Sequence, residues 1–569
     1  MYWLWGPMPT ALAQQPGVEV EITGVSGEML TNVQSNLSLY LQRNHPLLNE
    51  TLVRRLHQKA PDEIRKALEP FGYYRSKVDA SLEPRGQGWI ARYSIDPGPP
   101  VRVSQLNITI TGPGASDPAI EKWKNNYPFH VGSRFQDRVY DDAKQTLLQI
   151  GRERGYLDGR LETHRVTVNL EPYQAVIDIT YDTGPRYAFG DVSIEQTGFD
   201  EGLIRRFLTF KTGDPYDAAK ILALRRAFAD SDYFDRADVF TLSEEAHDEQ
   251  VPIRIVLAAR KANRYLAGAG YSTDTGARAR VGYENRHVNQ YGHRYSLTYR
   301  VSEIDSNLLA RYSVPLSHPA TDSLVYSYNY LNQRTDTANL VSNAVGFDVT
   351  QQTGHWQRTT GLSFERERYR IDITNNSTLL MPHVRWQRVK AEDRINPRHG
   401  WILTVGLRGA SDQVVSSTSF IQGRADGKMV EGLTENSRLL LRATTGASWT
   451  PEFRDVPASQ RFFAGGDNSI RGFAYNSLGP TNSAGTVIGG RNILVGSSEL
   501  EIDVTQRFGV AFFIDAGNAF DGTAIHVQRG AGAGLRFRTP VGAVRLDFAQ
   551  AETVPGRPWR IHFTLGPDL

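Results

Sequence analysis

The chain contains no cysteine among its 569 residues, which excludes disulfides, zinc–thiolate sites and thiol catalysis together. It also lacks any run of 18 or more apolar residues, and its mean hydropathy is −0.42, so it is not a helical membrane protein. An excess of charge is missing too, because 64 Lys and Arg stand against 62 Asp and Glu. Nothing in the composition therefore indicates a nucleic-acid partner. A β-barrel is not excluded, because its strands show only every second residue to lipid.

The residue constellations of common enzymes are absent as well. There is no G-x-S-x-G, no H-E-x-x-H and no P-loop, and the 13 histidines are scattered without ligand spacing. The glycine-rich run 530–534 lies in an expected strand and cradles nothing. We therefore expect a protein that is not an enzyme and that uses no cofactor and no metal.

The first residues are apolar and end in Ala11-Leu12-Ala13, which resembles a signal-peptidase site. We expect residues 1–13 to be a signal peptide, cleaved after Ala13. No Lys or Arg precedes the apolar part and that part is short, which leaves open a truncated signal with its true start upstream of Met1. The alternative is a disordered apolar tail.

Residues 18 to about 262 hold a weak internal repeat, with a period on the order of 80 residues. In each copy an amphipathic helix ends at an aromatic pivot that leads into a strand, at 71–74, 154–157 and 231–234. The proline- and glycine-containing links at 97–100 and 183–185 are stiff joints between copies. The sequence therefore predicts three tandem α+β domains, at 18–97, 100–184 and 186–262.

The order within each copy is strand, helix, helix, strand, strand, which resembles the POTRA domain. A three-stranded sheet covered by helices on one side has open edges, and such an edge can accept an extended segment of another chain as an added strand. This suits a domain that handles unfolded polypeptide. The alternative is a row of spacers with solvated faces, and the residues alone do not separate the two.

From Arg264 onward the helical period disappears and apolar and polar residues alternate. Eleven strand candidates lie between Arg264 and Thr450, and five more follow near residues 491, 509, 530, 541 and 558. Aromatic residues are plentiful, with 25 Tyr, 24 Phe and 9 Trp, as the interfacial girdles of a membrane barrel require. Residues 264–569 are therefore predicted to form a transmembrane antiparallel β-barrel of 16 strands, with an infolded loop at 450–490.

The expected loop centres on the triplet Arg471, Gly472, Phe473, which stands among turn-forming and aromatic residues. A guanidinium buried there needs carboxylates, because an unpaired buried charge is strongly destabilising. Alternation in the following strands places Glu499 and Asp515 opposite the apolar faces, hence inside the barrel. We expect these five residues to lock the loop onto the barrel wall. For the triplet alone, the alternative is an ordinary surface turn.

This arrangement resembles the outer-membrane β-barrel assembly and translocation superfamily, whose sixth extracellular loop carries an (I/V)-R-G-(F/Y) motif locked onto acidic lumen residues. Here the motif is Ile470 to Phe473. With three POTRA-like repeats and sixteen strands, nearly the whole chain resembles the TamA family, the outer-membrane subunits of the translocation and assembly module. The resemblance implies a bacterial outer-membrane protein with its POTRA domains in the periplasm, which inserts autotransporters and other β-barrels or serves envelope homeostasis. It also implies unfolded outer-membrane proteins as substrates, contact with outer-membrane lipid, and a TamB-like partner anchored in the inner membrane.

The two ends of the expected barrel pair weakly, because the first strand is rich in small residues and the last ends in Gly566 and Pro567. A seam between such strands can open sideways and offer a free edge to an incoming strand. The residues expected at this lateral seam are Leu266, Gly268, Gly270, Ile561, Phe563 and Gly566. The alternatives are an ordinary closed barrel that acts as a passive channel and a pore for polypeptide secretion.

Overall fold

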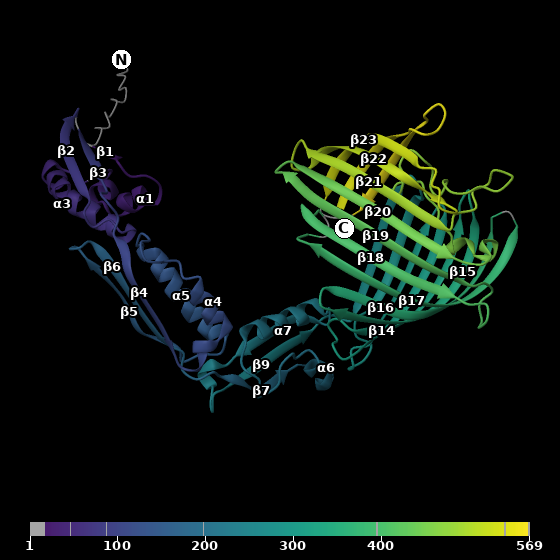
Figure 1. The fold of residues 1–569 in the computed structure, drawn as a ribbon, viewed down its shortest axis with the longest axis horizontal. Helices are drawn as coiled ribbons and strands as arrows, with labels where there is room; N and C mark the ends of the chain where they lie inside the picture. The colour runs from purple at the N-terminus through teal and green to yellow at the C-terminus, as the bar shows by residue number, and fades with distance from the viewer. Residues whose placement is uncertain are drawn as a thin grey trace, which may run out of the picture. The chain divides into compact units, whose positions relative to one another are not determined.

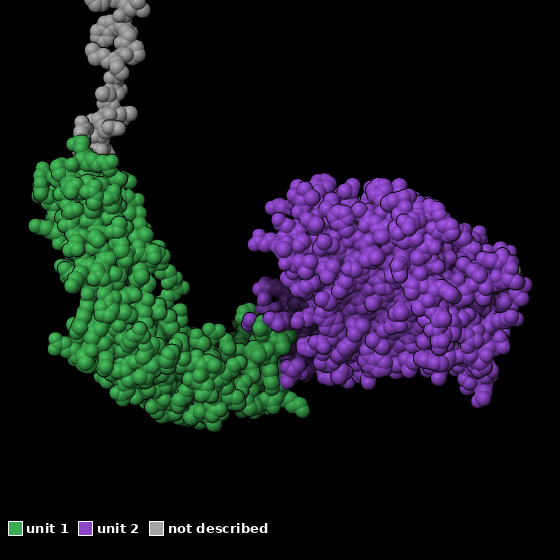
Figure 2. All heavy atoms as spheres, turned by 45° about the horizontal axis from the view of Figure 1, so that its top comes forward, with its two compact units in different colours: residues 1–193, 210–223, 239–254 green, residues 194–209, 224–238, 255–569 purple. Residues whose placement is uncertain are grey.

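The computed structural model describes residues 17–566 except 46, 87, 197, 372, 394–395 and 540–541. The expected signal peptide at 1–13 and Pro567 of the expected seam lie outside these residues. The chain divides into two compact units, coloured in Figure 2. One unit comprises 1–193, 210–223 and 239–254; the other comprises 194–209, 224–238 and 255–569.

The first repeat is a three-stranded sheet with helices packed against one face. Strand β3 lies in the centre, parallel to β1 and antiparallel to β2. Helix α3 begins where the Asn49 side chain accepts a hydrogen bond from the backbone N–H of Leu52, and its apolar stripe packs on the sheet. The elements are β1 (Val18–Thr23), α1 (Gly27–Asn36), α2 (Ser38–Gln42), α3 (Glu50–Leu68), β2 (Lys77–Arg85) and β3 (Gly88–Asp96).

The second and third repeats have the same strand order, with the last strand of each between the other two. This is the order of POTRA elements that the sequence predicts. The second repeat contains β4 (Arg102–Thr111), α4 (Pro118–Asn125), α5 (Asp137–Glu153), β5 (Arg160–Asn169) and β6 (Gln174–Asp182). The third contains β7 (Ala188–Glu195), α6 (Glu201–Arg205), α7 (Ala218–Asp230), β8 (Phe234–Thr241) and β9 (Gln250–Ala259).

Sixteen antiparallel strands, β10 to β25, form one continuous sheet that curves into a nearly closed barrel (Figure 1). The predicted fold class is confirmed, with eleven strands before the long loop and five after it. The strands before the loop are β10 (Asn263–Ser272), β11 (Gly276–Asn285), β12 (Arg294–Ser302), β13 (Asp305–Pro315), β14 (Ser323–Arg334), β15 (Asn339–Thr353), β16 (Trp356–Arg370), β17 (Thr374–Ala391), β18 (His399–Ala410), β19 (Phe420–Thr434) and β20 (Ser437–Trp449). Those after it are β21 (Asn492–Asp503), β22 (Phe508–Phe520), β23 (Gln528–Thr539), β24 (Gly542–Ala551) and β25 (Trp559–Gly566).

Alternation along β22 shows how the barrel wall is oriented. Phe512 and Ile514 are 54% and 53% exposed, whereas Phe513 and Asp515 are buried. Exposed apolar side chains at every second position form the lipid-facing band of a membrane barrel, and the residues between them point into the lumen. Among the described residues, no helix is both long and apolar enough to cross a membrane.

Candidate functional site

The segment between β20 and β21 folds into a compact structure of its own. Two short 3-10 helices, Phe453–Asp455 and Ala458–Gln460, are followed by bridges that join Phe462 to Gly490 and Ala464 to Leu478. Its apolar residues pack against inward-facing side chains of the barrel. The buried members of this cluster are Phe462, Ala464, Ile470, Phe473, Ile493, Val495, Ala519 and Ala551. The loop is therefore held inside the barrel by apolar burial as well as by charge.

Arg471 is the most highly connected side chain of this loop and is 2% exposed. Its backbone N–H and Nε donate to Asp515 Oδ2 at 3.0 and 2.8 Å, and Nη2 donates to Oδ1 at 2.9 Å. Nη1 donates to Glu499 Oε2 at 2.7 Å and to Asp547 Oδ2 at 3.0 Å. The guanidinium carbon also lies 3.4 Å from the centre of the Phe513 ring. The structure thus brings Arg471 together with both predicted carboxylates and with a third, Asp547, that sequence reasoning missed.

A second buried guanidinium, Arg536, binds the same carboxylates from the other side. It donates to Glu499 Oε1 and Asp547 Oδ1, both at 2.6 Å, and to Glu501 Oε1 at 3.0 Å. Arg438 in turn donates to Glu501 Oε2 at 2.7 Å. The result is a buried network of four carboxylates and three guanidiniums. The alternation of β23 and β24 signals that Arg536 and Asp547 face the lumen, but their pairing depends on the register of the strands.

Glycines allow the loop to approach the wall closely. Gly472 has φ +93°, and a Cβ on Gly530 of β23 would lie 1.8 Å from the Arg471 carbonyl oxygen. No other residue fits at Gly530 without displacing the loop backbone. Gly530, the first glycine of the run 530–534, therefore lets the loop lie directly against the barrel wall, a role that the sequence did not reveal.

The loop also reaches strands on other sides of the lumen. The backbone N–H of Ser459 donates to Glu367 of β16 at 3.3 Å, and Gln422 of β19 donates to the Gln460 carbonyl at 2.7 Å. The backbone N–H of Asp467 donates to Asp274, in the turn after β10, at 2.6 Å. Contacts to β16, β19, β21, β22 and β24 and to the first hairpin make the loop a bridge across the barrel.

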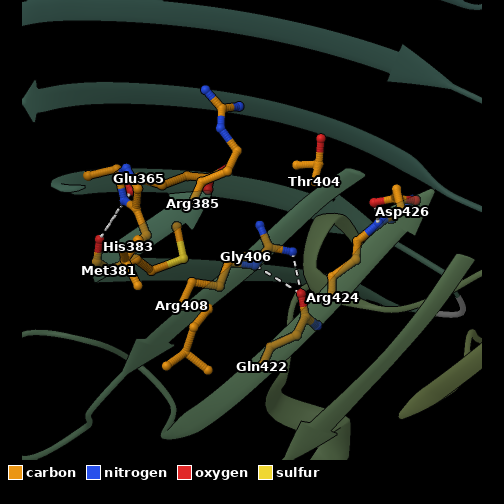
Figure 3. A pocket seen from close by; sticks show the side chains of 13 residues that line it. Glu365, Met381, His383, Arg385, Thr404, Gly406, Arg408, Gln422, Arg424 and Asp426 are labelled. Carbon is orange, nitrogen blue, oxygen red and sulfur yellow. Dashed lines mark hydrogen bonds and ion pairs between the residues drawn. The ribbon is translucent and has the colours of Figure 1, made fainter. Parts of the chain in front are cut away.

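A cavity of about 530 Å³ lies beside this bridge, and Figure 3 shows its charged lining. Several of its polar side chains form ion pairs or hydrogen bonds with one another. Arg424 pairs with Asp426 at 2.7 Å, and the Arg408 guanidinium donates to Gln422, which also bonds the loop. We interpret the cavity as part of the polar lumen wall, because these lining side chains are bonded to one another within the barrel.

The seam between β10 and β25 differs from every other strand boundary in the barrel. Within the described residues the two strands share no ladder, whereas β24 and β25 pair along eight positions. The direct hydrogen bonds run between Thr273, in the turn after β10, and Phe563: Thr273 N–H to the Phe563 carbonyl at 3.2 Å, and Phe563 N–H to Thr273 Oγ1 at 2.7 Å. Arg278 adds a side-chain bond to the Leu565 carbonyl at 3.2 Å.

Of the residues expected at the seam, Phe563 makes the direct contacts, and its ring lies 6.0 Å from that of Tyr271. Leu266, Gly268 and Gly270 pair with β11 on the far side of β10. Ile561 is 53% exposed on the outer face, and Gly566 pairs with Ala543 of β24. The expected residues thus belong to the two strands that flank the seam, while the direct hydrogen bonds are made through Thr273, which the sequence did not single out.

The comparisons with known proteins agree on one family. Residues 259–568 match the Omp85 superfamily domain, 19–97 match the first POTRA domain of TamA, and 187–260 match the POTRA family described as the surface antigen variable number repeat. The chain is 22% identical over 398 residues to the outer membrane protein assembly factor BamA of Nitratidesulfovibrio vulgaris, covering 66% of this chain and 50% of that protein. It is 21% identical over 480 residues to BamA of Neorickettsia risticii, covering 76% and 61%.

The chain therefore spans about half to three fifths of the length of these two relatives. Among solved structures, BamA from Haemophilus ducreyi lacking POTRA domains 1–3 is similar in fold, with a TM-score of 0.66 at 16% identity over 82% of this chain and 99% of that one. The superfamily match covers more than half of the sequence and coincides with the sixteen-stranded barrel. The chain belongs to the Omp85 superfamily, and is an outer-membrane β-barrel with POTRA domains in the periplasm.

Proposed function

We propose that this protein is an outer-membrane assembly factor that inserts β-barrel proteins, such as autotransporters, through the seam between β10 and β25. The observation that carries the proposal is the missing ladder between these strands in the part of the chain that the structure describes. The names of the BamA relatives, both assembly factors, support the same class of function. The match of residues 19–97 to a TamA domain supports the finer assignment to the translocation and assembly module.

The proposed mechanism is an exchange of backbone hydrogen bonds and involves no covalent chemistry. A strand edge facing lipid is unstable, because each unpaired amide in hydrocarbon costs several kcal/mol. An incoming strand of an unfolded outer-membrane protein removes that instability by pairing with β10. The adjoining bilayer is the destination of the substrate, and a TamB-like periplasmic protein is the partner that the resemblance to the TamA family suggests.

Cysteine crosslinking tests this proposal, since the natural chain has no cysteine. We would introduce one cysteine at Gly268 of β10, where an added Cβ has no heavy atom within 4 Å, and another in the terminal strand of a candidate autotransporter. The matched control is Gly423→Cys, an equally open position in β19, whose two neighbours are both paired. The disulfide is then measured during biogenesis of the substrate.

A crosslink at Gly268 and not at Gly423 is the expected result. Equal crosslinking at both positions would show that the contact is unspecific and would remove the seam from the mechanism. Absence of any crosslink, together with ready ion conductance, would assign the protein to passive channels. A substrate that accumulates outside the cell instead of in the membrane would favour a polypeptide secretion pore.

A further inference from the structure

The infolded loop touches both sides of the seam through a cluster of three side chains that the lock does not include. His562 lies on β25 and is 1% exposed, Asp467 belongs to the loop and is 6% exposed, and Asp274 follows β10. His562 Nδ1 lies 2.5 Å from Asp467 Oδ1, and the Asp467 backbone N–H donates to Asp274 Oδ2 at 2.6 Å. The last strand and the first hairpin are thus connected through the loop.

The hydrogen bonds of His562 indicate its ring tautomer. The backbone N–H of Gly472 donates to His562 Nε2 at 2.8 Å, so this nitrogen must be the acceptor. Nδ1 therefore carries the ring proton and donates a hydrogen bond to Asp467 Oδ1. Both imidazole nitrogens are then occupied, and no lone pair remains for a metal ion, although Asp274, Asp467 and His562 lie close enough together to hold one.

The loop backbone is shaped for this contact. Gly466 has φ +107°, and a Cβ there would lie 2.5 Å from Asp274 Oδ2. A glycine is required where a carboxylate approaches the backbone this closely at positive φ. Only three residues separate Asp467 from Arg471, whose guanidinium is bound to the wall strands. The lock and the seam are therefore joined by one short stretch of chain.

We propose that His562 is a positioning residue that fastens the terminal strand to the infolded loop, so that the loop holds the seam closed in place of a strand ladder. Directly across the seam, the described residues form one backbone–backbone bond at Thr273, one bond from the Phe563 backbone N–H to the Thr273 hydroxyl, and one side-chain bond from Arg278. Through the loop there are three more, from Gly472 to His562, from His562 to Asp467 and from Asp467 to Asp274. Displacement of the loop removes the three bonds made through it and leaves the seam held by the direct bonds from Thr273, Phe563 and Arg278.

Spin-label distances across the seam test this inference in the full-length protein reconstituted in lipid. Labels are attached to cysteines introduced at Ala269 of β10 and Ile561 of β25, both exposed. In His562→Ala the distance distribution should shift to longer separations and broaden, while the loop stays protected from trypsin, because the contacts of Arg471 are intact. The matched control is His383→Ala, a lumen histidine paired with Asp348 at 2.7 Å on strands away from the seam, and its distribution should not change.

Two further variants keep the inference testable if His562→Ala folds poorly. His562→Gln keeps one acceptor and one donor and should restore part of the original distribution. Asp274→Ala breaks the contact on the other side of the seam and should shift the distances in the same direction. Unchanged distances in His562→Ala and Asp274→Ala, with a shift only when Arg471 is replaced, would overturn the proposal.

The role of this contact in assembly rests on the proposed function, whereas the distance measurement needs no substrate. A seam that opens in His562→Ala without any change in substrate insertion would contradict the proposed function and leave the contact established. A seam that stays closed in that variant while Gly268 still crosslinks to substrate would refute the positioning role alone.

Discussion

Replacement of Arg471 by alanine should release the loop without destroying the barrel. The side chain gives Asp515 two hydrogen bonds and gives one each to Glu499 and Asp547. Arg536 still binds Glu499 and Asp547 at 2.6 Å after the change, so these two carboxylates stay paired. Asp515 is fully buried, and the nearest remaining cation, that of Arg442, lies 3.8 Å away. Asp515 is therefore the carboxylate that loses its hydrogen-bonded counter-charge.

Breaking a buried ion pair by removing one partner typically costs about 3–5 kcal/mol. With a tenfold change for each ~1.4 kcal/mol, the population of barrels with a displaced loop should rise by roughly 10² to 10³ or more. The assay is the rate of tryptic cleavage within the loop, compared with the temperature at which the folded barrel loses its fast migration in gels. Arg471→Ala should insert and migrate as a folded barrel, be cleaved rapidly in the loop, and lose assembly activity.

Two matched variants separate charge from packing. In Arg471→Ala/Asp515→Asn the stranded charge is gone, so much of the protease resistance should return. Arg471→Lys keeps the charge but cannot form the forked contacts, and should lie between the wild type and Arg471→Ala. Native protease resistance and full activity in Arg471→Ala would refute the reasoning. Equal cleavage of the single and double variants would refute the assignment of the loss to Asp515.

Two smaller predictions test other parts of the chain. Gly530→Ala places a Cβ on the Arg471 carbonyl and should expose the loop to trypsin, whereas Gly496→Ala, with open space at its Cβ, should behave as the wild type. In the first repeat, burial lowers the pKa of His57 below its ordinary value of 6.5, so protonation favours the unfolded state. Hydrogen exchange of that repeat, corrected for intrinsic rates, should therefore accelerate as the pH falls below about 6.5; this acceleration should be lost in His57→Gln and retained in His45→Gln.

The partners that the sequence suggests for Arg471 follow from a local rule. Alternation along β21 and β22 is enough to place Glu499 and Asp515 in the lumen, and burial of a guanidinium demands carboxylates. The same rule places Asp547 and Arg536 in the lumen as well. It does not say which inward side chains meet, since that depends on strand register and on the stagger of the barrel. The network of three guanidiniums was therefore beyond sequence reasoning, although each member's orientation was not.

The connection at the seam shows even more clearly that local sequence patterns do not tell which side chains meet. His562 and Asp274 are 288 positions apart, and they are brought near each other only because the sheet closes on itself and the loop lies between its edges. No periodicity relates the first strand to the last. The sequence did predict weak pairing at this boundary, from small residues in the first strand and the glycine and proline at the end of the last. In the first strand it pointed to residues 266–270, whereas the direct contact is made at Thr273; in the last strand it included Phe563, which makes that contact.

The distribution of charge explains how the loop can be held firmly and still be released. If Arg471 were the only cation bound to these carboxylates, its departure would leave four buried carboxylates unpaired and repelling one another. The free energy cost of releasing the loop would then be prohibitive. Arg536 and Arg438 remain bound to three of the four. Among the ion pairs of the network, the free energy cost of release thus falls mainly on Asp515, and the apolar contacts and other hydrogen bonds of the loop add to it. The contact of His562 ties the terminal strand to the same event, so that displacement of the loop leaves the edge of β25 held by the direct bonds at Thr273 and Arg278.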